Sequence, residues 1–218
     1  MRNPELDADL AYIQKVFAPE DDGLRAIRSR LRENDREGIN VSPVEGKILQ
    51  FLVRSFNCKK VVEVGALYGY SATWIARALP TDGKLYTLEK DSVCVEQTKR
   101  SVSECGVSDR VEVVAGDWAE NLPKLSKMGP FDLVFIDANK NGYFEILQWA
   151  IANVRTGGLI IGDNTLLFGA AKHDVKPADV SNEAWTAMRA FNQTLSDPTK
   201  FMSCMLPTTE GMTLAIKL

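Results

Sequence analysis

Residues 131–140 read FDLVFIDANK, a largely apolar run followed by Asp, Ala, Asn and Lys. Residues 159–164 read LIIGDN, a second apolar run that ends in Asp and Asn. Short apolar runs of this kind are typical of buried parallel strands, and open α/β sheets bind ligands outside the carboxyl ends of their strands. We therefore expect the polar residues that end both runs, above all Asp137 and Asp163, to lie at one edge of a sheet.

The polar ends of these two runs have the chemistry of a metal site. The carboxylates of Asp137 and Asp163 and the amide oxygen of Asn164 are hard oxygen ligands that leave room for substrate oxygens, which suits Mg²⁺, with Ca²⁺ or Mn²⁺ as alternatives. Lys140 is a candidate proton acceptor, because burial and positive surroundings lower the pKa of an amine. Asp and Asn also favour turns for backbone reasons alone. A turn would explain either residues 137–140 or residues 163–164 taken alone. The two segments together, beside the glycine loop described below, favour a functional site.

Length and composition indicate one α/β domain. The chain has 218 residues and is 45% hydrophobic, enough for one sizeable core over 1–218, with residues 1–40 as a helical extension. The net charge of −3 and the pI near 5.4 argue against a general affinity for nucleic acid or anionic membrane. Four cysteines without a Cys-x-x-Cys pair indicate reduced thiols. With no signal peptide and no apolar run of membrane-spanning length, we expect a cytoplasmic protein.

From residue 60 onward, strand and helix patterns alternate. The two last strands are separated only by a turn at 207–211, so they form a hairpin and one of them runs antiparallel. The pattern predicts a doubly wound seven-stranded sheet with helices on both faces. The expected strands are 60–65, 84–89, 110–115, 131–136, 157–162, 200–206 and 211–217, and the expected helices are 70–79, 92–105, 118–127, 142–154 and 182–196.

The first expected strand leads into a glycine loop. Residues 63–71 read EVGALYGYS, in which bare backbone and a helix N-terminus can approach a nucleotide-like ligand. The loop lacks the G-x-G-x-x-G spacing that holds a pyrophosphate. Glu63 suits the cationic amino acid end of a ligand, and Glu89 ends the second strand where an acidic residue takes ribose hydroxyls. Together these features favour S-adenosylmethionine over NAD.

With these motifs, residues 41–218 resemble the cation-dependent O-methyltransferases typified by caffeoyl-CoA and catechol O-methyltransferases, which are Rossmann-like enzymes. The resemblance implies that Asp137, Asp163 and Asn164 hold the metal ion, and that Lys140, Asp137 and Asn164 form the catalytic group. It implies a small phenolic acceptor, no nucleic acid or membrane partner, and a homodimer. The implied cofactor-binding residues are Val41, Glu63, Gly65, Ala66, Ser71, Glu89, Trp118 and Asp137.

The sequence departs from the family pattern near the expected acceptor. Asn139 replaces a more usual Asp, Leu167 stands where Trp is frequent, and Glu210 replaces the Asp of a common Asp-Gly turn. The chemistry nevertheless favours a catechol-like acceptor, because two vicinal hydroxyls can chelate a metal ion and a phenol must lose its proton before methylation.

Two other functions remain open from the sequence. One is a tRNA hydroxyuridine O-methyltransferase of the same family, which a basic surface around the site would favour. The other is a noncatalytic nucleotide-binding domain. The arginines at 25, 28, 30 and 32 are expected to form a solvated helix face, although they could serve a charged acceptor. The apolar face of the first helix, formed by Leu6, Leu10, Ile13, Val16 and Phe17, is expected to cover the acceptor site or a partner subunit.

Overall fold

The computed structural model describes residues 4–218, with side chains described from Ala8 onward. Seven strands form one sheet in the order β3-β2-β1-β4-β5-β7-β6, with β7 antiparallel to both of its neighbours. The strands are β1 (Lys60–Val64), β2 (Lys84–Glu89), β3 (Val111–Ala115), β4 (Phe131–Ile136), β5 (Val154–Gly162), β6 (Phe201–Leu206) and β7 (Met212–Lys217).

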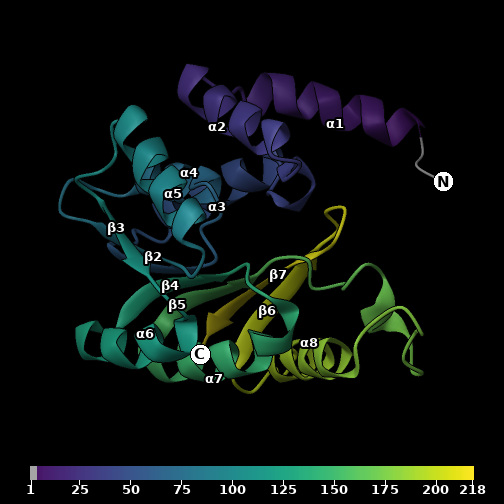
Figure 1. The fold of residues 1–218 in the computed structure, drawn as a ribbon. Helices are drawn as coiled ribbons and strands as arrows, with labels where there is room; N and C mark the ends of the chain where they lie inside the picture. The colour runs from purple at the N-terminus through teal and green to yellow at the C-terminus, as the bar shows by residue number, and fades with distance from the viewer. Residues whose placement is uncertain (1–3) are drawn as a thin grey trace.

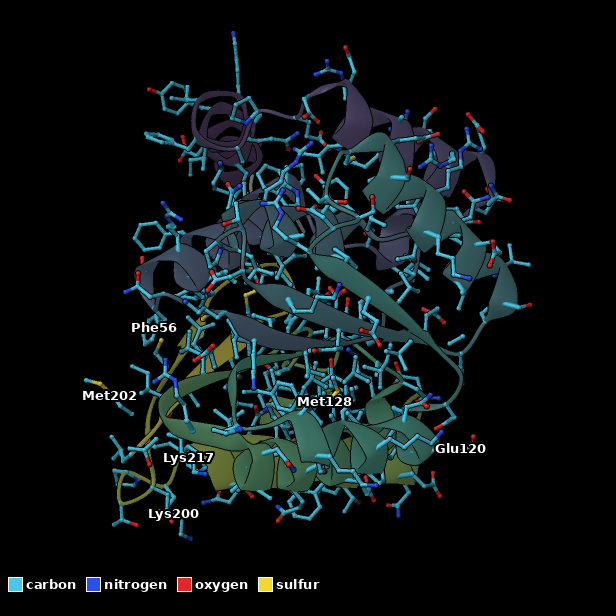
Figure 2. The ribbon with its side chains drawn as sticks, turned by 90° about the vertical axis from the view of Figure 1, so that its left-hand side faces the viewer. Phe56, Glu120, Met128, Lys200, Met202 and Lys217 are labelled. Carbon is cyan, nitrogen blue, oxygen red and sulfur yellow. The ribbon has the colours of Figure 1, made fainter. Side chains whose placement is uncertain are left out.

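Helices cover both faces of the sheet (Figures 1 and 2). One layer contains α2 (Asp22–Glu33), α3 (Pro43–Ser55), α4 (Tyr70–Ala78) and α5 (Ser92–Glu104), with α1 (Pro4–Phe17) outside it. The other layer contains α6 (Trp118–Leu125), α7 (Tyr143–Asn153) and α8 (Asn182–Leu195).

The strand sequences account for these two layers. Successive residues of a strand point to opposite faces, so Leu133 packs in the core beneath α2–α5, whereas its neighbour Val134 packs against α7 and α8. Both side chains are fully buried. Each central strand therefore needs apolar residues on both faces, and the runs in β1 and β4 are largely apolar, with Glu63 as a buried exception in β1.

The expected doubly wound fold with its terminal hairpin is confirmed, and most element bounds agree within one or two residues. The largest difference is β5, which begins at Val154 rather than 157. Val154 pairs with Phe131 and Leu159 pairs with Leu133, so a register shift separates the two pairs and contains Gly157 and Gly158. The expected helix at 118–127 ends at Leu125 and continues as a 3-10 turn, Ser126–Met128.

The N-terminal helices differ in how they bury their apolar residues. On α2, Leu24, Ile27 and Leu31 are buried in the core. On α1, by contrast, Val16 is 47% exposed and Phe17 is 63% exposed. Leu6 lies outside the described side chains. The apolar face of α1 therefore exists, but within this chain it is only partly covered.

The arginines of α2 form ion pairs, but the expected solvated face is wrong for two of them, because the side chains of Arg28 and Arg30 are only 26% and 12% exposed. Arg28 pairs with Glu20 at 2.8 Å and with Glu37 at 2.9 Å, and Arg30 pairs with Glu104 at 2.8 Å. Within residues 4–218, no helix has the length and apolar character needed to cross a membrane.

Candidate active site

The functional residues converge at the carboxyl ends of β1, β2, β4 and β5. The strand order reverses between β1 and β4, so the loops after these strands diverge and leave a crevice. A cavity of about 930 Å³ occupies this position. Its wall contains most of the expected site residues: Gly65, Glu89, Trp118, Asp137, Lys140, Asp163 and Asn164.

Gly65 allows the first and fourth strands to meet at the cavity. Its φ of +102° lies in a region that favours glycine, and a Cβ at this position would collide with the carbonyl oxygen of Asp137. The backbone N–H of Asp137 donates to the carbonyl of Val64 at 2.9 Å. A side chain at position 65 would therefore displace Asp137 as well as narrow the loop.

Glu89 is held in place by backbone groups. One carboxylate oxygen accepts a hydrogen bond from Leu67 N–H at 2.9 Å, and the other accepts from Asp91 N–H at 3.0 Å. A carboxylate oxygen has two lone pairs, so each can accept one further donor. This fixed orientation suits an acceptor for two hydroxyl groups on a bound ligand.

Glu63 lies beneath the cavity rather than in its wall. The side chain is fully buried, and Oε2 accepts from the Thr87 hydroxyl at 2.5 Å while Oε1 has no partner. Burial raises the pKa of Glu63 to about 7. An unpaired buried carboxylate oxygen is costly, and a cationic group of a ligand would supply the missing partner.

Three other expected cofactor residues lie near the cavity but do not line it. Val41, Ala66 and Ser71 are all buried, and Ser71 lies in the first turn of α4. Trp118 does line the cavity, and its ring packs against Gly142, where a Cβ would come within 2.6 Å of a ring carbon. The small residue at 142 therefore leaves room for the Trp118 indole.

Asp137 and Asp163 occupy equivalent positions on adjacent strands. Ile136 and Gly162, the last residues of β4 and β5, are in register, and each aspartate directly follows one of them. The Asp163 N–H donates to the Ile136 carbonyl at 3.0 Å, which fixes the two chain ends side by side. Asn164 follows with a φ of +52°, an uncommon conformation for a residue other than glycine.

The chemistry of these donors fits a divalent cation. The Asp163 side chain is nearly buried, and its Oδ1 has no hydrogen-bond partner. Burial and the neighbouring Asp137 carboxylate raise the pKa of Asp163 to about 8, and burial also raises the pKa of Asp137. Two converging carboxylates disfavour ionisation unless a positive charge joins them. Across residues 4–218 no three His, Cys, Asp or Glu side chains gather as ligands. Asn164, the next residue after Asp163, could add an amide oxygen.

Lys140 lies between the two aspartates. Its Nζ is 3.6 Å from Asp137 Oδ1 and donates to the Asp163 carbonyl at 3.3 Å. Burial lowers its pKa, which the charges of Asp137 and Asp163 oppose. A shorter contact, 2.6 Å, joins Nζ to the hydroxyl of Tyr143.

Sequence reasoning assigned no role to Tyr143. Residues 142–154 have the apolar spacing of a core helix, and Tyr143 is indeed fully buried. The signal that could have identified it is its position three residues after Lys140, about one helical turn away.

The remaining wall of the cavity comes from the loop after β5 and from the β6–β7 turn. Thr165 N–H donates to the Gly211 carbonyl at 3.0 Å, and Leu166 N–H donates to the Glu210 carbonyl at 2.9 Å. These bonds bring Glu210 to the cavity, together with Phe168, whose side chain is 74% exposed. The sequence marked Glu210 only as a departure from the family pattern.

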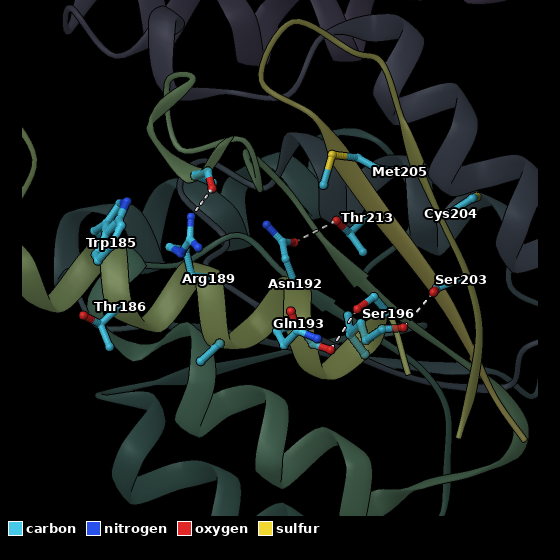
Figure 3. Close-up of a pocket in the computed structure, with 13 residues that line it drawn as sticks. Trp185, Thr186, Arg189, Asn192, Gln193, Ser196, Ser203, Cys204, Met205 and Thr213 are labelled. Carbon is cyan, nitrogen blue, oxygen red and sulfur yellow. Dashed lines mark hydrogen bonds between the residues drawn. The ribbon is translucent and has the colours of Figure 1, made fainter. Parts of the chain in front are cut away.

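A second cavity, of about 770 Å³, lies between α8 and the β6–β7 hairpin (Figure 3). Several of its polar side chains already bond to one another or to backbone groups. Arg189 donates to the Ala171 carbonyl at 3.2 Å, and Asn192 accepts from the Thr213 hydroxyl at 3.3 Å. None of its lining residues belongs to the expected site.

The sheet order, the glycine loop and the acidic residue ending β2 together define a Rossmann-like methyltransferase of the S-adenosylmethionine-dependent class. A family model described as O-methyltransferase matches residues 14–218. The chain therefore belongs to the O-methyltransferase family and is an enzyme of that class.

The similar proteins agree on fold and reaction class. The catechol O-methyltransferase of Niastella koreensis is 36% identical over 220 residues, which cover 99% of each chain. The caffeoyl-CoA O-methyltransferase of Eucalyptus gunnii is 30% identical over 218 residues, covering 95% of this chain and 86% of the other. The crystal structure of the O-methyltransferase TomG of Streptomyces achromogenes, in complex with SAM (S-adenosylmethionine), superposes with a TM-score of 0.88 at 32% identity, covering 100% and 99% of the chains.

Proposed function

We propose that this enzyme uses S-adenosylmethionine and a divalent cation to methylate one hydroxyl of a catechol-like small molecule. The single observation that carries the proposal is the buried, unpartnered Oδ1 of Asp163 in the same cavity wall as Asp137 and Lys140. The similarity to a catechol O-methyltransferase over the full length supports the choice of acceptor.

The cofactor would occupy the side of the cavity formed by β1 and β2. Glu89 would accept the ribose hydroxyls, and Glu63, Ser71 and the backbone at Val41 and Ala66 would hold the methionine end. Gly65 leaves space for this ligand because it has no side chain. Trp118 would border the adenine.

Asp137, Asp163 and Asn164 would hold a cation, with Mg²⁺ favoured by the all-oxygen donor set. When bound, such an ion acts as a Lewis acid that lowers the pKa of a coordinated hydroxyl. Lys140 Nζ would accept the proton of the acceptor hydroxyl, and the oxygen would then attack the methyl carbon in line with the departing sulfur. The cavity walls contribute by holding the two reactants in contact.

The experiment is a methylation assay on a panel of catechols, simple phenols and hydroxyuridine-containing tRNA, with and without a chelator. We expect activity on catechols, loss of that activity with chelator, and recovery with Mg²⁺. Calorimetric titration with Mn²⁺ gives a readout that does not depend on turnover. Full activity in chelator with no Mn²⁺ binding would exclude the cation from the mechanism.

The two alternatives have less support. The arginines of α2 are engaged with acidic side chains, and the cavity wall contains Glu45, Asp179 and Glu210, so a polyanionic RNA would meet negative charge. A noncatalytic role would not account for the contact of the partly buried Lys140 with Asp137 or for the buried carboxylate of Asp163.

We also propose that the chain is a single domain, 1–218, whose α1 contributes to a homodimer in the cytoplasm. The exposed side chains of Tyr12, Val16 and Phe17 on α1 support this assignment. Light scattering of the purified protein tests the dimer, for which we expect twice the chain mass.

A further inference from the structure

Tyr143, the first residue of α7, joins three parts of the site through one hydroxyl group. This hydroxyl lies 2.6 Å from Lys140 Nζ, 2.7 Å from the Asp163 carbonyl oxygen and 3.0 Å from the Ile136 carbonyl oxygen. The side chain is fully buried. Its ring packs against Phe191 with 5.4 Å between ring centroids, which limits its movement.

The direction of these hydrogen bonds follows from the donors available. A tyrosine hydroxyl has one hydrogen, and carbonyl oxygens can only accept. Tyr143 therefore donates to the carbonyl of Asp163 or of Ile136, and it must accept its contact from Lys140. The hydroxyl is thus a fixed acceptor for one N–H of the lysine.

This arrangement determines where the Lys140 nitrogen lies. The Tyr143 hydroxyl, at 2.6 Å, and the Asp163 carbonyl, at 3.3 Å, each accept one N–H of Lys140 and hold the nitrogen from two directions. The nitrogen also lies 4.3 Å from the Tyr143 ring centroid. Without the hydroxyl, the flexible lysine could move toward Asp137, which is 3.6 Å away.

We propose that Tyr143 is a positioning residue that holds Lys140 Nζ in the cavity wall, where it can meet the acceptor hydroxyl. This inference rests on the proposed function, in which Lys140 accepts the proton. Its rival is a purely structural role, because the same hydroxyl ties together the carbonyl ends of β4 and β5. The two roles differ in whether the loss of the Tyr143 hydroxyl lowers kcat only when the Lys140 amine is present.

A double-mutant cycle separates them. The single variants Tyr143→Phe and Lys140→Met and the combined variant are assayed at saturating S-adenosylmethionine and Mg²⁺ with a simple catechol. We expect Tyr143→Phe to lower kcat about 10- to 100-fold, as for other misplaced catalytic groups, with KM for the catechol nearly unchanged. In the Lys140→Met background the same change should alter kcat less than about threefold, because a positioning effect needs the amine.

Equal losses of kcat in both backgrounds would overturn the proposal. So would weakened Mn²⁺ binding in Tyr143→Phe that parallels the loss of kcat, since the residue would then act through Asp163. If Lys140→Met alone has normal kcat, the proton-acceptor role in the proposed function fails. If Lys140→Met lowers kcat but the losses of the two single variants simply multiply in the combined variant, only the positioning role of Tyr143 is excluded.

The matched control is Tyr86→Phe. Tyr86 is also buried and packs edge-on against an aromatic ring, Phe131, but it lies on β2 and outside the cavity wall. It should leave kcat within about twofold. If Tyr143→Phe does not fold, Phe191→Leu loosens the Tyr143 ring while keeping its hydroxyl. A smaller loss of kcat that also disappears in the Lys140→Met background supports the proposal, and an equal loss in both backgrounds opposes it.

Discussion

The loops after β1 and β5 form opposite walls of one cavity and are built differently. After β1, the chain makes a short turn and enters α4 at Tyr70, with positive φ at Gly65, Gly69 and one larger residue, Leu67. After β5, the chain continues from Gly162 to Asn182 before α8 begins. This second loop places three larger residues in left-handed conformations, with φ of +52° at Asn164, +51° at Leu167 and +53° at Phe168. Such conformations carry a cost that surrounding contacts must offset.

Glu89 and Asp163, which lie at the ends of β2 and β5, differ in how their oxygens are satisfied. Both oxygens of Glu89 already accept backbone hydrogen bonds, so its orientation is set without a ligand. Asp163 instead has a buried oxygen without a partner, and so does Glu63 on β1. The backbone therefore orients Glu89, whereas a bound positive charge would supply the partner that Asp163 and Glu63 each lack.

The largest effect is expected for Asp163→Ala, which removes a proposed metal ligand from the β5 side of the cavity. Lewis-acid stabilisation is worth several kcal/mol, so kcat should fall about 10³-fold or more. Binding of S-adenosylmethionine, measured by calorimetry, should change less than about threefold, because the other side keeps its contacts. Mn²⁺ binding in the same instrument should disappear. A variant that retains Mn²⁺ affinity would remove Asp163 from the ligand set.

The next largest effect is expected for Lys140→Met, which keeps much of the aliphatic stem but removes the amine. Loss of a general base costs about 10²–10⁴ in rate, and we expect the lower part of this range because a bound cation also acidifies the acceptor. Single-turnover rates for a series of ring-substituted catechols provide the measurement. Acidic catechols should lose least, and an equal loss across the series would show that Lys140 positions the substrate only.

The contrast between the two loops also explains what could be predicted from sequence. Gly65 and Glu89 lie at the ends of strands, where the first needs an unusual backbone conformation and the second accepts backbone hydrogen bonds. Such positions can be predicted directly from residue type and spacing. Asp137 and Asp163 could be paired because adjacent strands end in register. The seven strands and the terminal hairpin followed from the alternation of apolar runs and from the helix-free turn at 207–211, whereas the order of the strands is known only from the folded chain.

Features that depend on tertiary packing could not be predicted. Tyr143 has the spacing of a core residue, and only the folded chain shows its hydroxyl between β4, β5 and Lys140. The start of β5 at Val154 required knowledge of its pairing with Phe131. Glu210 reaches the cavity through hydrogen bonds between the β5 loop and the β6–β7 turn, which join residues far apart in sequence.

On the cofactor side, Glu89→Ala should weaken S-adenosylmethionine binding by the value of a charge-assisted hydrogen bond, about 1.5–3 kcal/mol, or about 10- to 150-fold in Kd. The change also frees Leu67 N–H and Asp91 N–H, so Glu89→Gln, which keeps an acceptor, should lose less. Mn²⁺ affinity should stay the same in both variants, in contrast to Asp163→Ala. Calorimetry with an unchanged Kd for S-adenosylmethionine would exclude Glu89 from the cofactor site.

The smallest effect is expected for Glu210→Gln at the acceptor side. Glu45, Asp179 and Glu210 give this part of the wall a negative charge, and Lys140 lies close enough for the charge of Glu210 to act on its pKa. A catechol with an alkylammonium group should therefore be preferred over one with a carboxylate. Partly exposed charge pairs contribute about 0.2–1 kcal/mol, so Glu210→Gln should reduce the ratio of the two kcat/KM values by no more than about fivefold. The effect should shrink in high salt, because salt screens exposed charges.

The matched control is Glu183→Gln on α8, which makes the same change outside the cavity wall. If both variants shift the ratio equally, the preference reflects the net charge of the protein rather than Glu210.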